Sequence, residues 1–360
     1  MAGTCNTKSA EGQAPVAGTC NTKSAEGQTP VSGTCNTKNG AGKGAGKAAA
    51  DAKKQALVDR IARAKAERGA VILAHYYTRP EVQDLADFIG DSLALARIAT
   101  TFDNKVVVMC GVHFMAETVK ILCPEKTVLI PDTEAGCSLA DSCPADAFET
   151  FVKAHPDHTV ISYVNTSAEV KALSDVLVTS SNALKVVESF DKDAKIIFGP
   201  DRNLGNYINS VTGREMTLWD GACHVHERFS VEKVLELKAS HPGAKVLVHP
   251  ECRKPLLTVA DKVGSTGALL SYAKSDDAET FIVATESGIL HQMAKDCPTK
   301  TFIAVPPEDA TCGCNDCAYM KLVTLEKLAG CLENLSPQVE VDSAVAARAR
   351  KSIERMLQLS

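Results

Sequence analysis

Residues 71–77 read VILAHYY, an apolar run that ends in polar and aromatic side chains. Seven further runs have a similar character: VVVMCGV (106–112), TVISYV (159–164), DVLVTSS (175–181), AKIIFGP (194–200), KVLVHPE (245–251), TFIVATE (280–286) and TFIAVPPE (301–308). Short, nearly continuous apolar runs rich in β-branched residues are typical of strands in parallel sheets that are covered on both faces.

Segments with helical periodicity separate these runs, for example LADFIGDSLALARIA (85–99) and VEKVLELKAS (231–240). Strands that alternate with helices predict an α/β fold built on parallel sheets. The eight apolar runs are spread over the chain that follows residue 50, and they fit several small sheets as well as one large sheet. The pattern alone leaves that choice open.

The first fifty residues have a different composition. Residues 2–16 nearly recur as residues 17–31, and a third copy begins at Ser32, so that one cysteine returns in each repeat as Cys5, Cys20 and Cys35. Large apolar residues are almost absent, so the segment cannot bury enough surface to offset its ordering entropy. We therefore predict a disordered tail over residues 1–50. Metal capture by the tail is less favoured, because one cysteine per repeat gives no chelating pair.

Composition excludes several classes of protein. The 360 residues carry a formal net charge of -5, which argues against a basic nucleic-acid-binding face. No apolar run approaches the roughly 20 residues of a membrane helix, and the N-terminus lacks the apolar segment of a signal peptide. The 14 cysteines then favour metal or catalytic thiols in a reducing compartment over disulfides. We expect a cytoplasmic protein that binds neither nucleic acid nor membrane.

Polar side chains gather where the predicted strands end and where helices begin. The strand-end residues are His75, Tyr77, Tyr163, Asn165, Ser180, His249 and Glu251. The carboxyl ends of parallel strands are where ligands bind in α/β folds, so these residues are candidates for substrate contact. Ser92, Ser180, Ser265 and Thr266 stand at predicted helix starts, where anions can bind. Ordinary helix capping explains any one of these hydroxyls equally well.

Three cysteine segments are candidates for metal binding. Cys137 lies in EAGCSLADSC near a helix start that is expected to stabilise a thiolate, with Cys143 as its rival in the same segment. Cys223 lies in WDGACHVHERF, beside two histidines. The strongest local signal is the triplet of TCGCNDCAYM, formed by Cys312, Cys314 and Cys317. The second C-x-x-C pair of a zinc site is missing, whereas widely separated cysteines joined to a clustered one can hold an iron–sulfur cluster.

Ten segments that occur in the same order resemble quinolinate synthase, over nearly all of residues 57–357. They are AHYYTRPEVQDLADFIGDSLALAR, GVHFMAETVKILCPEKTVLIPD, AGCSLADSCP, YVNTSAEVKA, VTSSNA, GPDRNLGNYI, GACHVHERF, VHPECR, VGSTGALL and CNDCAYMKL. The repeated tail lies outside the resemblance.

The resemblance implies three similar α/β/α domains with small parallel sheets, in a pseudo-threefold arrangement around a central active site. On this chain their bounds become 51–136 with 318–360, then 137–223, then 224–317. The resemblance also implies three cysteine ligands of a 4Fe–4S cluster, one associated with each domain; the matching positions, Cys137, Cys223 and Cys317, lie at the boundaries between these ranges. Three protein ligands leave one iron open to act as a Lewis acid on substrate.

The activity that the resemblance implies is the condensation of iminoaspartate with dihydroxyacetone phosphate to quinolinate, in de novo NAD biosynthesis. The enzyme that produces iminoaspartate is a candidate partner. Glu251 is the expected general base, assisted by Tyr77 and His226. The implied substrate-binding residues are His75, Ser92, Tyr163, Asn165, Ser180, His249, Ser265 and Thr266.

Two alternatives stay open at this point: a metal-dependent aldolase-type lyase on the same scaffold, and a non-catalytic cysteine-rich metal-binding protein. The C-x-C spacing of Cys312 and Cys314 also departs from the C-x-x-C-x-x-C of some family members. A disulfide between residues so close would close a strained ring, so a redox switch at this pair is in question.

Overall fold

The computed structural model describes residues 41–307 and 315–360. The chain divides into two units, residues 1–49 and residues 50–360. Helix α1 (Ala41–Arg68) begins inside the segment predicted to be a tail, where alanine and lysine are good helix formers. The tail cysteines Cys5, Cys20 and Cys35, and the pair Cys312 and Cys314, lie outside the described residues.

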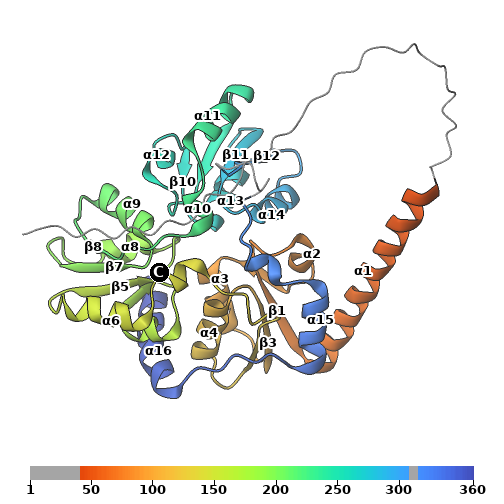
Figure 1. Ribbon diagram of the computed structural model, residues 1–360, viewed down its shortest axis with the longest axis horizontal. Coiled ribbons are helices and arrows are strands. Elements are labelled where there is room, and N and C mark those ends of the chain that lie inside the picture. The colour runs from red at the N-terminus through yellow and green to blue at the C-terminus, as the bar shows by residue number, and fades with distance from the viewer. Residues whose placement is uncertain (1–40, 308–314) are drawn as a thin grey trace, which may run out of the picture. The chain divides into compact units, whose positions relative to one another are not determined.

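The described strands form three four-stranded parallel sheets, which confirms the predicted α/β class and decides the number of sheets (Figure 1). The first sheet contains β1 (Ala70–His75), β2 (Phe88–Gly90), β3 (Val106–Cys110) and β4 (Thr127–Leu129). The second contains β5 (Thr159–Tyr163), β6 (Val176–Val178), β7 (Ile196–Gly199) and β8 (Thr217–Leu218). The third contains β9 (Lys245–Val248), β10 (Lys262–Val263), β11 (Thr280–Ala284) and β12 (Thr301–Ala304). All three have the same strand order, in which the first strand lies between the second and the third.

The same aspartate contact recurs in each sheet. Asp87, Asp175 and Asp261 each lie just before the second strand of their sheet, and each accepts a hydrogen bond of 2.8 Å from a backbone N–H of the first strand. A repeated side-chain contact of this kind, added to the repeated strand order, makes the three sheets close structural copies. The copies allow equivalent positions to be compared along the chain.

The eight predicted runs are strands β1, β3, β5, β6, β7, β9, β11 and β12. The four strands without a predicted run are β2, β4, β8 and β10, which have only two or three residues. Such lengths are too short for a periodic signal. The helix predicted over residues 85–99 is wrong at its beginning, because β2 occupies Phe88–Gly90 and helix α3 runs only from Ser92 to Ala99. The helix predicted over residues 231–240 is confirmed as α11 (Val231–Ser240).

Helices lie between the strands and after the last sheet. They are α2 (Pro80–Gln83), α4 (His113–Leu122), α5 (Ser138–Asp141), α6 (Ala145–Lys153), α7 (Ala168–Ala172), α8 (Ala183–Glu188), α9 (Arg202–Thr212), α10 (His224–Glu227), α12 (Lys254–Leu257), α13 (Thr266–Ser275), α14 (Ile289–Asp296), α15 (Leu325–Asn334) and α16 (Ser343–Leu359), with a 3₁₀ turn at Met320–Leu322. The described part of the chain contains no helix with the length and hydropathy that membrane crossing requires.

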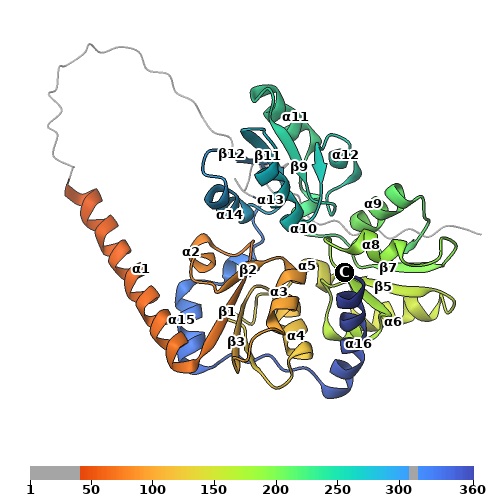
Figure 2. The ribbon, with the colours of Figure 1, turned by 180° about the vertical axis from the view of Figure 1, so that it is seen from behind.

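The first sheet is covered on both faces, which explains its unbroken apolar strands. Leu73 of β1 packs into a core shared with α3 and α4, whereas its neighbour Ile72 packs into a core shared with α1 and α15. Figure 2 shows α3 and α4 on one side of β1 and β3, and α15 on the other. The C-terminal helix α16 packs against α7, β6 and α4, and so links the first two sheets.

Candidate active site

One cavity of about 70 Å³ is lined by segments that follow strands of all three sheets. Its volume is enough for several water molecules or a small ligand. Twelve of the residues proposed from sequence line it: His75, Tyr77, Ser92, Cys137, Tyr163, Asn165, Ser180, Cys223, His226, His249, Glu251 and Thr266. Residues that are up to 191 positions apart in the chain thus share one space, because the carboxyl ends of the parallel strands converge on it.

The lining is one small set of positions used three times. Strand pairing makes His75, Tyr163 and His249 equivalent, and two residues further on stand Tyr77, Asn165 and Glu251. Ser92, Ser180 and Thr266 each stand five residues after the aspartate that anchors the first strand. Each sheet therefore presents one ring-bearing side chain, one polar side chain and one hydroxyl to the cavity.

Ser265 is placed differently from the sequence expectation. Its Oγ accepts a hydrogen bond of 3.3 Å from the N–H of Ala268, which makes it the N-cap of α13, and it does not line the cavity. Its equivalents in the other two sheets, Asp91 and Thr179, do line the cavity but were not predicted as site residues. A comparison of the three strand-to-helix segments with one another would have identified both.

Glu251 has the largest number of close polar neighbours in the cavity, and its side chain is only 3% exposed. Its Oε1 accepts a hydrogen bond of 2.5 Å from the hydroxyl of Tyr163. Its Oε2 lies 3.1 Å from Nδ1 of His226, and Oε1 lies 3.6 Å from Nδ1 of His249. Glu251 is therefore a buried group with polar partners and not a solvated charge beyond a strand.

These neighbours set the charge state of the carboxyl group. Burial on its own raises the pKa of Glu251, but the imidazole of His226 and the Tyr163 hydroxyl outweigh it and lower that pKa to about 2. Glu251 is thus an ionised carboxylate at neutral pH. Burial also keeps the Tyr163 hydroxyl protonated, because it raises the pKa of Tyr163 well above its ordinary value.

His75 and His249 are held as neutral imidazoles. Burial lowers the pKa of His75 to about 4 and that of His249 to about 3. In each, Nδ1 accepts a backbone N–H from two residues later, that of Tyr77 at 3.2 Å and that of Glu251 at 3.4 Å. The proton of each ring therefore resides on Nε2, which is left as a donor for a ligand.

A chain of hydroxyl groups joins Tyr77 to His226. The Tyr77 hydroxyl lies 2.6 Å from Oγ1 of Thr266 and 2.8 Å from Oγ1 of Thr285, and Thr285 Oγ1 lies 3.0 Å from Nε2 of His226. Thr285 is a residue that the sequence reasoning missed, because its strand end gave no motif of its own. Asn165 adds an acceptor, since its buried Oδ1 has no hydrogen-bond partner among the described residues.

The three predicted cysteine ligands occupy equivalent places. Cys137, Cys223 and Cys317 each lie in the segment that leaves the fourth strand of a sheet, directly before or close to a short helical turn. Side chains of all three pack against one core, and Cys137 and Cys223 also line the cavity. Cys143, the rival of Cys137, is buried instead in a separate core beside Phe148.

The expectation of a thiolate at Cys137 is wrong for the cluster-free chain. Burial raises the pKa of Cys137 to about 12, and the amides of the four-residue helix α5 only partly oppose it. Burial likewise raises the pKa of Cys317 to about 11 and that of Cys223 well above its ordinary value. The three thiols stay protonated unless a bound cation displaces their protons. Together with the nearby imidazole and carboxylate, they are a ligand set compatible with a metal cluster.

Comparison with known proteins identifies the family of the chain. A family model described as "Quinolinate synthetase A protein" matches residues 59–358. The chain belongs to the quinolinate synthetase A family. The "Quinolinate synthase" of Thermosynechococcus vestitus is 56% identical over 304 residues, which cover 84% of this chain and 95% of the relative. Those of Chloroherpeton thalassium and Synechocystis are both 54% identical over 304 residues, again 84% of this chain and 94% and 95% of theirs.

In this family member, two buried carboxylates hold the backbone of two of the predicted cysteine ligands. Asp201 Oδ2 accepts a hydrogen bond of 3.3 Å from the N–H of Cys223, and Glu286 Oε1 accepts one of 3.0 Å from the N–H of Cys317. Strand pairing shows that Asp201 and Glu286 are equivalent, each lying just beyond the third strand of its sheet. We call these two residues the carboxylate brackets. The first sheet has Val112 at the same position.

The bracket at Glu286 is neutralised by a lysine. Lys321 Nζ lies 2.8 Å from Glu286 Oε1 and donates a hydrogen bond of 2.7 Å to the carbonyl of Tyr77. The other oxygen, Oε2, accepts the N–H of Gly288 at 2.7 Å. One ion pair thus connects the Cys317 segment to the strand end at Tyr77, whose hydroxyl lines the cavity.

Proposed function

We propose that the chain catalyses the condensation of iminoaspartate with dihydroxyacetone phosphate to quinolinate, with release of phosphate and water, in the de novo synthesis of NAD. The observation that carries the proposal is the cavity, which gathers twelve of the expected residues from three sheets in a chain of the quinolinate synthetase A family. Its curated relatives bear the name of this activity and match along nearly their whole length.

The polar groups that line the cavity suit substrates with three anionic groups in all. Iminoaspartate brings two carboxylates and dihydroxyacetone phosphate brings one phosphate. The cavity offers three equivalent hydroxyls, one for each of these anionic groups, from Ser92, Ser180 and Thr266. The Nε2–H groups of His75 and His249 add neutral donors, which bind an anion without an ion pair that would hold the product too tightly.

We propose that Glu251 moves the protons of the ring-forming steps. In the ligand-free cavity its carboxylate is stabilised by His226. A substrate that separates it from this imidazole removes the stabilisation and leaves burial, which raises its basicity toward the range useful for a general base. The Tyr163 hydroxyl at 2.5 Å is placed to share that proton. The Tyr77–Thr285–His226 chain of hydrogen bonds is a second proton path.

We propose that Cys137, Cys223 and Cys317 hold a 4Fe–4S cluster. The residues fit this group, since three partly buried thiols come from three equivalent segments and need a cationic partner to ionise. When bound by three protein ligands, such a cluster supplies one iron that is free to act as a Lewis acid on a substrate oxygen. The chain's own part is to orient the substrates and to transfer their protons.

We further propose that each sheet and its helices form one of three domains, bounded at 51–136 with 318–360, at 137–223 and at 224–317. A cytoplasmic location fits the pathway, and the enzyme that produces iminoaspartate is the expected partner. Ser265 contributes through the cap of α13 and so orients Thr266, its neighbour in the cavity.

The test is an anaerobic assay of the iron-loaded chain for quinolinate, with Glu251→Gln as the variant. Glutamine keeps the shape and can still accept from Tyr163, but it cannot take a proton. Turnover should fall roughly 10²–10⁴-fold while iron and sulfide per chain stay unchanged. An iron-loaded chain that forms no quinolinate would overturn the function, and near-normal turnover of Glu251→Gln would overturn the role of Glu251.

A further inference from the structure

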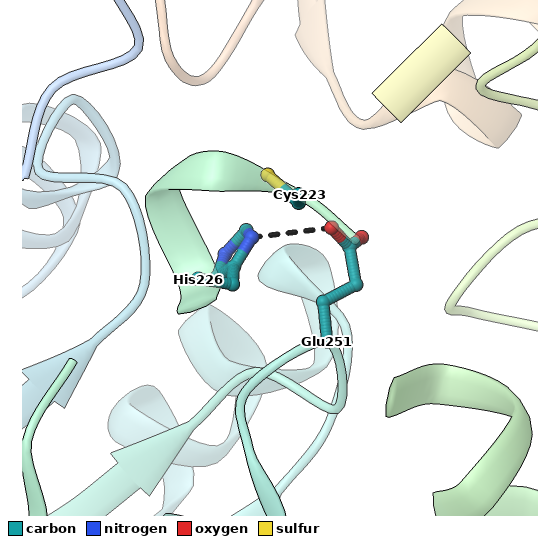
Figure 3. A group of neighbouring side chains, drawn as sticks. All are labelled: Cys223, His226 and Glu251. Atoms are coloured by element: carbon teal, nitrogen blue, oxygen red, sulfur yellow. Dashed lines mark ion pairs between the residues drawn. The ribbon is translucent and has the colours of Figure 1, made fainter. Parts of the chain in front are cut away.

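Cys223, His226 and Glu251 form a compact group of three different ligand types. One ligand atom from each lies within 4.8 Å of the other two, and across residues 50–307 and 315–360 no other triad of this kind occurs. Figure 3 shows the three side chains facing one another, Cys223 and His226 from a single helical turn and Glu251 from the loop after β9. Cys137 and Cys317 do not belong to this group.

A second observation concerns the nitrogen of His226 that faces Glu251. The side chain is 3% exposed, and Nδ1 lies 3.1 Å from Glu251 Oε2. The two atoms stand at ion-pair distance, but Nδ1 makes no hydrogen bond to Oε2 or to any other described atom. A buried ring nitrogen without a hydrogen bond is costly, and a metal cation bound between Nδ1 and Oε2 would give both atoms a partner.

The atoms that face away from the group are already held. His226 Nε2 bonds to Thr285 Oγ1 at 3.0 Å, and Glu251 Oε1 accepts from the Tyr163 hydroxyl at 2.5 Å. Metal-ligating histidines and carboxylates are commonly oriented by such bonds on the atom that does not bind the metal. His226 Nδ1 and Glu251 Oε2 are thus left to point into the same space.

We propose that the protein without its cluster binds one divalent transition-metal ion of the Zn²⁺ type through Cys223 Sγ, His226 Nδ1 and Glu251 Oε2, and that this ion excludes the cluster. The exclusion follows because Cys223 belongs to both sites, and this half of the proposal rests on the cluster of the proposed function. Binding converts the Cys223 thiol to a thiolate and releases its proton to solvent.

The donor set selects the class of metal. Sulfur, nitrogen and one carboxylate oxygen are ligands of Zn²⁺ and Co²⁺, whereas Mg²⁺ and Ca²⁺ prefer oxygen alone. Ligand atoms around a tetrahedral zinc are about 3.4–3.6 Å apart for bond lengths of about 2.0–2.3 Å. The nitrogen and oxygen lie 3.1 Å apart, slightly closer than this range, and the sulfur lies within 4.8 Å of both, so movements of about 1 Å complete the set. The fourth position faces the cavity.

The first experiment is an anaerobic titration of the chelator-treated, cluster-free full chain with Co²⁺, followed by displacement with Zn²⁺. A thiolate-to-cobalt charge-transfer band should grow until the wild type has bound one equivalent of Co²⁺ more than Cys223→Ala. The Cys223→Ala titration measures the Co²⁺ bound by other cysteines of the chain, and this amount is subtracted. Cys317→Ala is the matched control, since it removes a proposed cluster ligand but none of this group, and it should keep the band. A band that survives in Cys223→Ala, or that is lost in Cys317→Ala, overturns the site.

A second pair of variants avoids changing a ligand. Thr285→Val removes the hydroxyl that orients His226 at almost constant volume, and Thr285→Ser keeps it. Loss of such an orienting partner should weaken Co²⁺ binding about 10–100-fold in Thr285→Val, with affinity restored in Thr285→Ser. Equal affinities in the two variants would show that Nε2 of His226 is not held for metal binding and would overturn this part of the site.

The competition is tested by adding iron and sulfide to the chain with and without one equivalent of Zn²⁺. The zinc-loaded chain should take up no cluster until a zinc chelator is added, whereas the zinc-free chain assembles it. Cluster assembly at the same rate in both overturns the exclusion. A zinc-free chain that assembles no cluster contradicts the proposed function instead, and the cobalt titration then still decides the single-ion site.

Discussion

Replacing Lys321 by methionine should destabilise the fold strongly, although Lys321 is outside the cavity lining. Methionine keeps most of the side-chain volume but removes the charge that neutralises Glu286, whose side chain is 1% exposed. The two backbone N–H groups of Cys317 and Gly288 remain as its partners. The carbonyl of Tyr77 also loses its donor.

The magnitude follows from the burial of the pair. Removing one partner of a buried ion pair typically costs about 3–5 kcal/mol. Because the Lys321 side chain is 16% exposed, the lower end applies, and we expect a loss of about 3 kcal/mol in the free energy of unfolding. In a folded unit that extends over residues 50–360, this lowers the thermal midpoint by about 5 °C.

The assay is urea unfolding of four chains: wild type, Lys321→Met, Glu286→Gln and the double variant. In the Glu286→Gln background no charge is left stranded, so Lys321→Met should cost less there by about 2 kcal/mol. The control is Lys153→Met, which removes an exposed pair of similar length, 2.9 Å to Glu149, and should cause no measurable change. Equal costs of Lys321→Met in both backgrounds would refute the bracket argument.

Three further predictions use other features. Cys137→Ala should lose the iron of the anaerobic protein, whereas Cys143→Ala, buried in a separate core, should keep it; the reverse would mean that the wrong cysteine of this segment has been assigned. Burial lowers the pKa of Lys171 from 10.5 to about 8, so between these values the unfolded chain holds a proton that the folded chain has released, and stability should rise with pH by about 3 kcal/mol across the window. Urea unfolding at pH 8 and at pH 10 should show this rise in wild type but not in Lys171→Met, and an identical rise in both would exclude Lys171 as its source. Deleting residues 1–50 should leave iron content and turnover unchanged, because the family match begins only at residue 59, and a deletion that loses iron would contradict this.

The sequence by itself determined the fold class and most of the residues that line the cavity. Unbroken apolar strands such as residues 106–110 can be buried only between two layers, and this fact predicts parallel sheets. Polar residues directly after such strands, such as His249 and Glu251, fall at the carboxyl edge whatever the number of sheets. Those inferences need only local pattern and the alternation of side chains along a strand.

The tertiary structure decided what depends on contacts between distant residues. Strands of two residues, such as β10, exist only because a neighbouring strand supplies their hydrogen bonds, so no local pattern predicts them. Burial raises the pKa of Cys137, so the expected thiolate is a neutral thiol. Packing also gives two neighbouring hydroxyls different roles, since Ser265 caps a helix and Thr266 lines the cavity. Tyr163 and Glu251 belong to different sheets, and each carboxylate bracket holds a cysteine that follows a different strand of its sheet. Only packing brings these residues within hydrogen-bond distance.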